Sequence, residues 1–507
     1  MLLRYTASAD TTIVNAYQPN LVTRGTGSNM GLADVLETFS IYGRQQVSSS
    51  KYQASQELSR ILIKFPTTTL AADRTAGTIP ASGSVSFYLK LYNAQHSKAV
   101  PRDYKLVVHP VSQSWQEGEG LDLEGYKDVT KGNPGTNWLS ASDSAAWSVA
   151  GGDFLTSSAH LIYAQNFEAG TEDLELNITN LVESWLAGNT DNYGVGIYLS
   201  ASYEGYFSGS HFANSGSVLN NTNGAKKSYF TKRFFARGTQ YFFKKPVIEA
   251  RWDSSRRDQR NEFYFSSSLA PAADNLNTIY FYNYVRGRLR NIPAVGTGSI
   301  HVSLHSGNAG NTDAAGSRLQ LYNGHQYITG GYVSTGVYSC SIGIASSSTS
   351  PLFDVWHTGG VQYYTGSIKP RVFEGSNYEP TERYIINLTN LENSYRADET
   401  QRLNLFVRPK NWNPTIYTKA TAKVPTTNIQ SASYRVIRAV DNLEVVPYGT
   451  GSDKHTILSY DGNGNYYDFN MSLLEPGYEY KFKFSFYNDR MSSWEEQQEE
   501  FRFRVEK

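Results

Sequence analysis

The sequence is poor in cysteine, in net charge and in long apolar runs, and each shortage excludes a class of protein. Cys340 is the one cysteine in 507 residues, so neither an internal disulfide framework nor a multi-thiolate metal site can form. Lys plus Arg and Asp plus Glu both number 46. Without net positive charge there is no bulk field to attract nucleic acid or an anionic membrane, and we expect neither as a partner.

Signals for export and for membrane insertion are also missing from the sequence. The first ten residues contain no basic n-region and no long apolar h-region, and no run approaches the roughly 18 apolar residues that span a bilayer. The composition nevertheless resembles that of extracellular proteins. We therefore expect a protein made in the cytoplasm of a host and displayed outside only after assembly into a virus particle. A chain trimmed of its signal peptide is the other explanation.

Aromatic and turn-forming residues are abundant. Aromatics make up 14% of the chain, with 37 tyrosines and 42 glycines, whereas charged residues make up only 18%. Runs such as 60–65, 85–92 and 104–109 alternate in polarity, which is the period of half-buried strands. One short helix is predicted over 180–187, ending at Gly188. The sequence therefore predicts an all-β protein with long loops.

The predicted architecture is a large jelly-roll-like sandwich followed by two smaller immunoglobulin-like β-sandwich domains. Turn signals and changes in composition place the large sandwich at 1–253, a linker at 254–276, and the smaller domains at 277–370 and 371–507. We interpret the linker arginines as solvated or as bridging to a neighbouring subunit; they are Arg256, Arg257 and Arg260.

Three local patterns in the last domain predict specific structures. Residues 474–480 resemble the turn and tyrosine corner that open a late strand of sandwich domains. Residues 461–465 contain Asp-Gly and Asn-Gly pairs, which are typical of hairpin turns, although their spaced oxygens also resemble the start of a calcium loop. Residues 499–505 alternate cleanly and predict an edge strand with charge on its exposed face.

The stretch from Trp115 to Asp153 is the most distinctive in the chain. It combines three tryptophans with glycines and acids and has no helical periodicity, so we expect a long ordered loop across one end of the first sandwich. Its tryptophans Trp115, Trp138 and Trp147 either plug that end or contact a host-surface glycan. Its acids are solvated or cap turns, bind calcium, or act as a glycosidase pair; they are Glu117, Glu119, Asp122, Glu124 and Asp153.

Two further sets of residues are candidates for contacts. Basic and aromatic residues alternate between 226 and 245, which favours an exposed strand pair or a subunit interface over single-stranded nucleic acid; the central ones are Arg233, Phe234 and Phe235. No cofactor is expected, with calcium left open. The candidate calcium ligands are Asp122, Asp153, Asp461, Asn463 and Asn465.

The first half of the chain resembles the DNRLRE family, a β-sandwich related to carbohydrate-binding modules and common in large secreted bacterial proteins. The resemblance lies in the order of its motifs more than in any single one. The matching segments are 9–13, 59–65, 111–118, Trp138, Trp147, 151–153 and 192–197. It implies a sandwich fold for this half.

The whole chain also resembles virion structural proteins of contractile-tailed phages, especially those that infect marine cyanobacteria. The segments that carry this resemblance are 246–252, 279–283, 403–408, 412–417 and 447–451. It implies a neck, tail, baseplate or fibre component.

We therefore predict a non-enzymatic virion protein that contacts other phage structural proteins, forms a homo-oligomer and adheres, in one version of this role, to host-surface glycan. No His-Glu-X-X-His cluster, nucleophile elbow or phosphate-binding loop occurs in the sequence. Two alternatives remain open. One is a secreted or surface carbohydrate-binding protein. The other is a hydrolase of cell-envelope polysaccharide that depends on Glu117 or Glu119.

Overall fold

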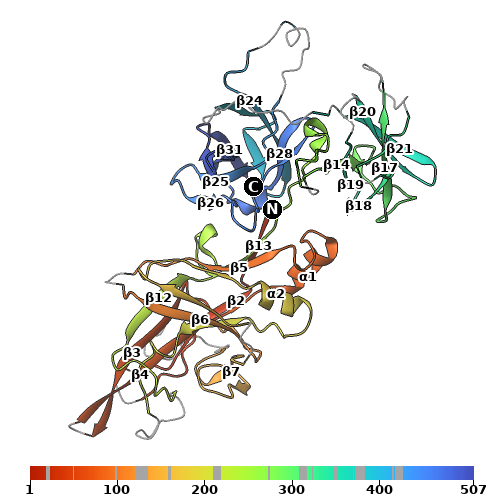
Figure 1. Cartoon of the computed structure of the whole chain (residues 1–507). Coiled ribbons are helices and arrows are strands. Elements are labelled where there is room, and N and C mark those ends of the chain that lie inside the picture. The colour runs from red at the N-terminus through yellow and green to blue at the C-terminus, as the bar shows by residue number, and fades with distance from the viewer. Residues whose placement is uncertain are drawn as a thin grey trace. The chain divides into compact units, whose positions relative to one another are not determined.

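The computed structural model divides the chain into two compact units. The first comprises Met1–Asp253 with Gly451–His455, and the second comprises Ser254–Thr450 with Thr456–Lys507 (Figure 1). For residues 42–48 and 51–55 the structure describes the backbone alone. It describes all other residues except 19–22, 49–50, 97–99, 122–134, 158–160, 209–218, 272–273, 308–316, 323, 346–350, 369, 372–382, 414–415 and 417–425.

The described part of the first unit contains two large antiparallel sheets. The smaller has the strand order β1 (Leu2–Thr6), β13 (Val247–Arg251), β5 (Ser86–Leu91) and β10 (Leu174–Asn177). The larger has the order β12 (Tyr229–Phe235), β3 (Val35–Ser48), β4 (Lys51–Lys64), β11 (Val195–Leu199), β6 (Tyr104–Pro110) and β9 (Tyr163–Phe167), and β2 (Ala9–Val14) also pairs with β4.

The main core of this unit lies between the two sheets. Strand β5 contributes Phe87, Leu89 and Leu91, and β4 contributes Ile61 and Ile63 from the other side. Two helices add apolar residues to the same core: α1 (Thr67–Ala76), which the sequence did not predict, and α2 (Thr179–Leu186), which confirms the predicted helix. The result is a sandwich.

The long loop of the sequence covers the outer face of the larger sheet rather than one end of the sandwich. Because strand side chains alternate between faces, Leu58 and Leu62 of β4 point away from the main core. They pack instead in a second apolar cluster with Trp115, Trp138 and Trp147. The loop folds through a small hairpin of β7 (Ser140–Ser142) and β8 (Ala145–Ala146), so β4 is buried on both faces.

The second unit begins with a six-stranded antiparallel sheet. Its order is β14 (Asn277–Tyr282), β19 (Val337–Ile342), β18 (Ile328–Ser334), β17 (Ile300–Ser306), β20 (Leu352–Thr358) and β21 (Val361–Ile368), and a hairpin of β15 (Tyr284–Val285) and β16 (Arg288–Leu289) follows β14. Phe281 of β14 stacks on Tyr364 of β21 with ring centroids 5.0 Å apart, so the first and last strands approach each other and the sheet curls around its core. The core includes Cys340, which is 5% exposed.

The stretch 254–276 contributes to that core. After the 3-10 turn η5 (Gln259–Glu262), Phe263 and Phe265 are buried among the strands of the curled sheet. Arg260 pairs with Asp258 at 2.6 Å and with Asp354 at 2.7 Å, and Trp356 Nε1 donates to Asp354 Oδ2. The interpretation of Arg260 as a solvated residue is therefore wrong.

The end of the chain forms a second sandwich-like arrangement. One sheet has the order β22 (Tyr384–Leu388), β24 (Thr400–Pro409), β28 (Gly464–Asn470) and β27 (Ser459–Asp461). The other has the order β23 (Ser394–Arg396), β31 (Phe501–Glu506), β29 (Glu479–Asn488), β25 (Ala432–Arg438) and β26 (Glu444–Val446), with β30 (Ser493–Glu496) on β29. Aromatic rings join the sheets, as between Tyr434 and Tyr467, whose centroids are 4.4 Å apart.

Two of the local predictions for this region are confirmed and one is wrong. The Tyr480 hydroxyl donates to the carbonyl of Glu475 at 2.8 Å, which is the predicted tyrosine corner. Asp461 pairs with Gly464 across a two-residue hairpin turn. Strand β31 is not an edge strand, because it pairs with β29 on one side and in parallel with β23 on the other.

Replacing Arg260 with Met tests the buried ion pairs of the second unit. The change leaves Asp354 and Asp258 without their cation in a buried site, which costs about 3–5 kcal/mol of unfolding free energy. We expect an earlier transition in urea, measured by circular dichroism. The matched control is Arg396→Met, which removes an exposed pair with Asp398 and costs less than about 1 kcal/mol. Equal midpoints for the two variants would contradict the prediction.

Candidate functional site

The tryptophans of the long loop are packing residues in the structure. Trp115, Trp138 and Trp147 are 9%, 0% and 6% exposed. Trp115 Nε1 donates to the carbonyl of Tyr193 at 2.7 Å, and Trp147 Nε1 donates to the carbonyl of Asn137 at 2.9 Å. Their rings are therefore not presented to solvent as a platform on which a sugar could stack.

Arg60 of β4 lies beneath the loop and connects it to the sheet. Its guanidinium carbon is 4.3 Å from the ring centroid of Tyr198 and 5.5 Å from that of Trp138. Its Nη1 donates to the carbonyl of Gly151 at 3.0 Å, and Glu204 is 3.8 Å away. Burial raises the pKa of Glu204. A buried cation thus holds the loop through aromatic faces and one backbone carbonyl.

Gly151 is required at this contact for two reasons. Its φ of 89° is in the region that L side chains rarely adopt, and a Cβ there would lie 2.9 Å from the Trp138 ring. Another residue at position 151 would be strained in this backbone conformation, and its side chain would not fit beside Trp138.

A second anchor fastens the start of the loop. The side chain of Asn29 is fully buried, and its Nδ2 donates to the carbonyls of Glu117 and Thr136 at 2.7 and 2.8 Å. Its Oδ1 accepts from the backbone N–H of Gly120 at 3.1 Å. One buried amide therefore replaces strand pairing for this part of the loop.

Glu117 belongs to an ionic cluster rather than to a pair with Glu119. Arg237 Nη2 donates to both oxygens of Glu117, at 2.8 and 3.0 Å, and the backbone N–H of Asp10 donates to Glu117 Oε1 at 2.8 Å. Asp10 is 1% exposed, and burial, together with the nearby charge of Glu117, raises its pKa to about 7. Glu119 is exposed. The two glutamates therefore do not form the facing carboxylates of a glycosidase.

The side-chain oxygens of three candidate calcium ligands, Asp153, Asp461 and Asn465, accept hydrogen bonds from backbone N–H groups. Asp153 accepts from the backbone N–H groups of Ser148 and Val149, both at 2.9 Å, and Asp461 Oδ1 accepts from the backbone N–H of Asn463 at 2.7 Å. The buried amide of Asn465 bonds to both the N–H and the carbonyl of Ile429. Asp122 and Glu124 lie outside the described residues. Within the described ranges, no group of three or more His, Cys, Asp or Glu is arranged to hold a metal.

The basic and aromatic residues of β12 are mostly used inside the first unit. Phe234 is fully buried in the main core, and Arg233 Nε is 3.2 Å from Glu37. Phe235 contacts the ring of Tyr241 with centroids 5.4 Å apart. Tyr229 is different, because it is 66% exposed at the start of this sheet-edge strand.

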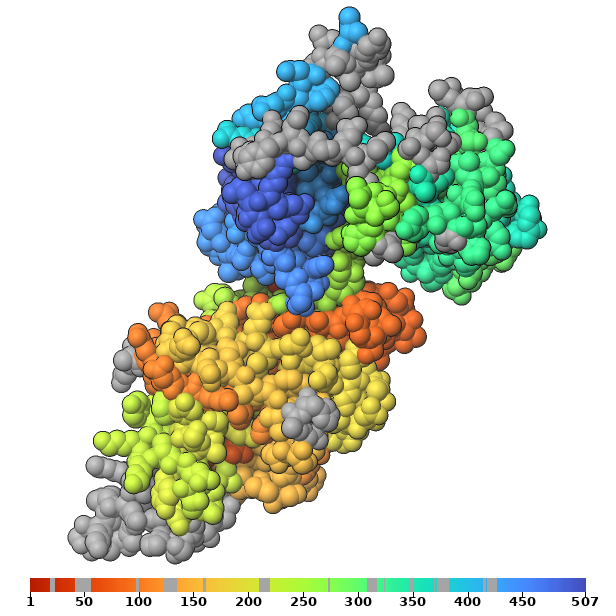
Figure 2. All heavy atoms as spheres, viewed as in Figure 1, coloured from red at the N-terminus to blue at the C-terminus, as the bar shows by residue number. Residues whose placement is uncertain are grey.

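Two hollows open on the surface of the first unit. One, of about 640 Å³, lies beside the long loop, and its lining includes Arg60, Asp153, Phe154 and Tyr198. The other, of about 770 Å³, lies where Arg74 of α1 meets α2; the two helices are neighbours at the surface, in orange and yellow in Figure 2. Both volumes are within the range of small-ligand sites, about 300–1,000 Å³.

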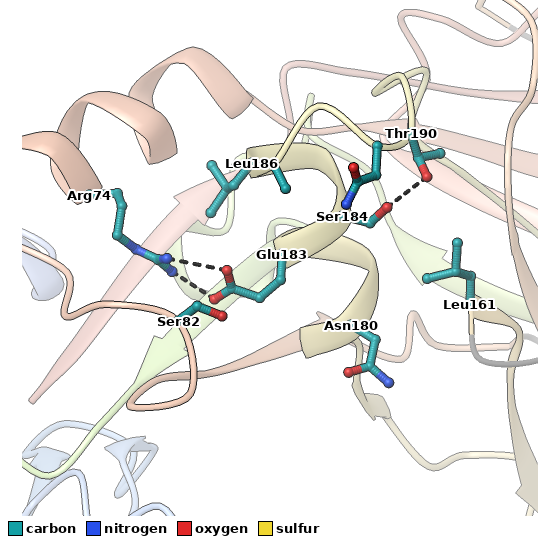
Figure 3. A pocket seen from close by; sticks show the side chains of 10 residues that line it. Arg74, Ser82, Leu161, Asn180, Glu183, Ser184, Leu186 and Thr190 are labelled. Carbon is teal, nitrogen blue, oxygen red and sulfur yellow. Dashed lines mark hydrogen bonds and ion pairs between the residues drawn. The ribbon is translucent and has the colours of Figure 1, made fainter.

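The hollow between the helices is built around an ion pair. Figure 3 shows Arg74 of α1 reaching Glu183 of α2 through two hydrogen bonds, at 2.7 and 3.2 Å. The Ser184 and Thr190 hydroxyls are 2.7 Å apart nearby. Arg74 and Glu183 neutralise each other, so neither offers a free charge that could bind a ligand in this hollow.

The longest feature of the first unit is the hairpin of β3 and β4. Strand β12 pairs with β3 only over Val35–Ile41, and β2 pairs with β4 only over Ser59–Lys64. From the pair of Tyr42 with Gln56 to that of Ser48 with Lys51, the two strands pair only with each other in the described part of the chain. We call this segment, residues 42–48 and 51–56, the arm; it extends away from the rest of the sandwich (Figure 1).

Comparison with known proteins assigns no family. No protein-family model and no curated protein matches the chain. Among solved structures it is 10% identical to fibronectin(III)-like modules of Clostridium thermocellum CbhA, covering 50% of this chain and 92% of that one with a TM-score of 0.15. It is 10% identical to the Ig1-2 module of the Drosophila receptor protein tyrosine phosphatase DLAR, covering 46% and 91% with a TM-score of 0.13.

A third similar structure is trypsin-activated alpha-2-macroglobulin from Escherichia coli, at 10% identity and a TM-score of 0.17, where the match covers 82% of this chain and 29% of that one. Scores this low carry no argument about function. The chain is all-β, with several sheets in sandwich-like units and distant structural similarity to these domains. None of the described helices is long and apolar enough to cross a membrane.

Replacing Gly151 with Ala tests the contact between the loop and Trp138. The left-handed backbone costs a non-glycine residue about 1–2 kcal/mol, and crowding against Trp138 adds about 1–3 kcal/mol. The control, Gly188→Ala, has a similar φ of 72° but meets nothing within 4 Å, so it reports the backbone contribution alone. We expect urea denaturation to show a larger loss of unfolding free energy for Gly151→Ala. The same loss in both variants would mean that the loop adjusts freely.

Replacing Asp10 with Asn tests the ionic cluster. The folded pKa of about 7 is above the ordinary value of 3.8, so the folded state binds more protons between these values. The unfolding free energy contributed by Asp10 therefore falls as pH rises from about 4 to about 7, on the order of 4 kcal/mol. Urea denaturation at several pH values should show that the difference in unfolding free energy between the wild type and Asp10→Asn depends on pH across this range. If the plots of unfolding free energy against pH are parallel for the two proteins, Asp10 is not a titrating group in this range.

Proposed function

We propose that this protein is a non-enzymatic structural component of a bacteriophage virion, part of a tail, neck, baseplate or fibre, and that it acts through protein–protein contacts. The observation that carries the proposal is the arm. The resemblance of the chain to virion proteins of contractile-tailed phages points the same way.

An isolated two-stranded ribbon needs a partner. Such a ribbon is at best marginally stable in water, and both of its edges present unpaired N–H and carbonyl groups. Seven residues on one strand, 42–48, span roughly 20 Å at about 3.3 Å per residue. A neighbouring subunit that adds a strand to the arm would satisfy those groups and order the ribbon.

The base of the arm offers apolar surface for the same contact. Tyr229 and Ile41 are directly opposite each other on β12 and β3 and are 66% and 37% exposed. Tyr206 is 44% exposed in the same unit. Tyrosine is enriched at protein interfaces because it offers a large contact area with few rotatable bonds. The proposed partners are other phage structural proteins and further copies of this chain, within the virion.

The proposal includes the finer architecture expected from the sequence. The first sandwich would have jelly-roll-like connections over 1–253, and the curled sheet at 277–370 and the sandwich at 371–507 would be immunoglobulin-like domains joined through 254–276. A series of β domains of this kind suits a protein that binds other proteins rather than one that catalyses a reaction.

A second candidate is a secreted or cell-surface carbohydrate-binding protein, or a virion protein that adheres to host-surface glycan. It is favoured by the hollow beside the long loop, where the half-buried rings of Phe154 and Tyr198 line the same space as Arg60. Aromatic rings and a few polar groups are the usual lining of such sites. A glycan array with the full chain separates the candidates, because competable sugar binding without particle association would favour this second one.

Shortening the arm tests the proposed contact. We expect a variant in which residues 43–55 are replaced by Asn-Gly to fold, because Tyr42 stays opposite Gln56 and the remaining strands keep their pairing in the sheet. It should fail to enter particles, whereas Arg396→Met, a change at an exposed pair, should enter normally. Mass spectrometry of purified virions measures both.

The possible outcomes test the role of the arm and the proposed function separately. If the intact chain is absent from virions, the proposed function is wrong. If the shortened chain is incorporated as well as the intact one, the protein is a virion component but the arm is not its contact.

A further inference from the structure

Two histidines are directly opposite each other in the curled sheet of the second unit. His301 of β17 and His357 of β20 are paired residues in an antiparallel ladder, and their ring centroids are 5.9 Å apart at an interplanar angle of 44°. The ring of Tyr327 covers the pair, with centroids 4.8 Å from His301 and 6.3 Å from His357. The two imidazoles are therefore held together by backbone pairing and by a third ring.

The pair lies on the face of the sheet that is turned away from the apolar core. Ile300 and Val302, the neighbours of His301, are buried in that core, as is Trp356 beside His357. Alternation along a strand places the histidines on the opposite face, where both are partly exposed. A small ion can therefore approach them without crossing the core.

Among the described residues, each histidine also has a ring nitrogen without a hydrogen-bond partner. The two atoms are His301 Nδ1 and His357 Nε2, and both are shielded from solvent. Shielded polar atoms are normally satisfied, so two unsatisfied nitrogens on facing rings need an explanation.

The separation of the rings suits a shared ion. A histidine nitrogen binds Zn²⁺ at about 2.1 Å, and the ring adds about 1 Å between nitrogen and centroid, so two rings reach one ion when their centroids are up to about 6 Å apart. The observed 5.9 Å is within this limit. Small rotations about the side-chain bonds are enough, and the strands need not move.

We propose that His301 and His357 form a binding site for a divalent first-row transition-metal ion, such as Zn²⁺ or Cu²⁺, with water completing the coordination. Imidazole is a preferred ligand of these ions, and Cu²⁺ binds nitrogen sites more tightly than Zn²⁺. Because the two ligands are on neighbouring strands, an ion here would cross-link β17 to β20.

Titration of the full chain with ZnCl₂ and with CuCl₂ tests the site. Isothermal titration calorimetry should show one saturable site for each ion, tighter for Cu²⁺, and none for MgCl₂. Electron paramagnetic resonance of the Cu²⁺ complex should show two nitrogen ligands. The single variants His301→Ala and His357→Ala should each weaken binding about tenfold or more, since even outer-shell partners of a metal contribute that much.

Two controls test a thiol and a histidine elsewhere in the chain. Cys340→Ser removes the one thiol, and His109→Ala removes a half-buried histidine of the first unit that bonds to Tyr198. Both should bind Cu²⁺ like the wild type. The proposal is overturned if no saturable site is found, or if the resonance spectrum shows fewer than two nitrogens. It is also overturned if binding survives in both histidine variants with unchanged affinity.

Discussion

The structure of the first unit depends on the burial of strand β4 on both of its faces. Ile61 and Ile63 point into the main core, whereas Leu58, Arg60 and Leu62 point outward. An antiparallel sheet normally leaves one face to water. Here the outward face carries leucines and a buried cation, so the chain must supply a second layer. The tryptophan loop is that layer, and its composition suits this role, with aromatics to cover the leucines, a carbonyl for Arg60, and glycines where backbone meets backbone.

A chain without net charge can still contain strong ionic interactions, because many of its charges are paired inside the fold. Glu249 is fully buried, and burial alone would raise its pKa, but Arg4, Lys90 and Arg251 together outweigh this and lower it to about 2. In the second unit, Arg260 between Asp258 and Asp354 joins the stretch before the sheet to strand β20. Buried ion pairs contribute little net stability but penalise any arrangement that separates them. In both units they therefore favour the arrangement of strands in which the charges are paired.

Features that depend on neighbouring residues were predictable from the sequence, and features that depend on distant pairing were not. The hairpin at Asp461–Gly464, the corner at Tyr480 and helix α2 were predicted, because their signals lie within a few residues. Helix α1 was missed because it is threonine-rich and buries only Leu70. Strand β31 was misplaced at an edge because its outer partner, β23, is a distant strand of three residues. In the candidate site the loop was found, but not its partners: Asp10, Asn29 and Arg237 approach it from about 90 to 120 residues away.

The single cysteine has a practical consequence for locating the molecule in a larger assembly. Cys340 is 5% exposed in the core of the curled sheet, and burial raises the pKa of its thiol well above the ordinary value. A thiol in this state reacts slowly, because the thiolate is the reactive form. The folded protein is therefore a nearly silent background for thiol-directed labels. A cysteine introduced at any exposed position would carry a fluorophore or a gold cluster at one known point, and a few such points would give both the place and the orientation of each copy.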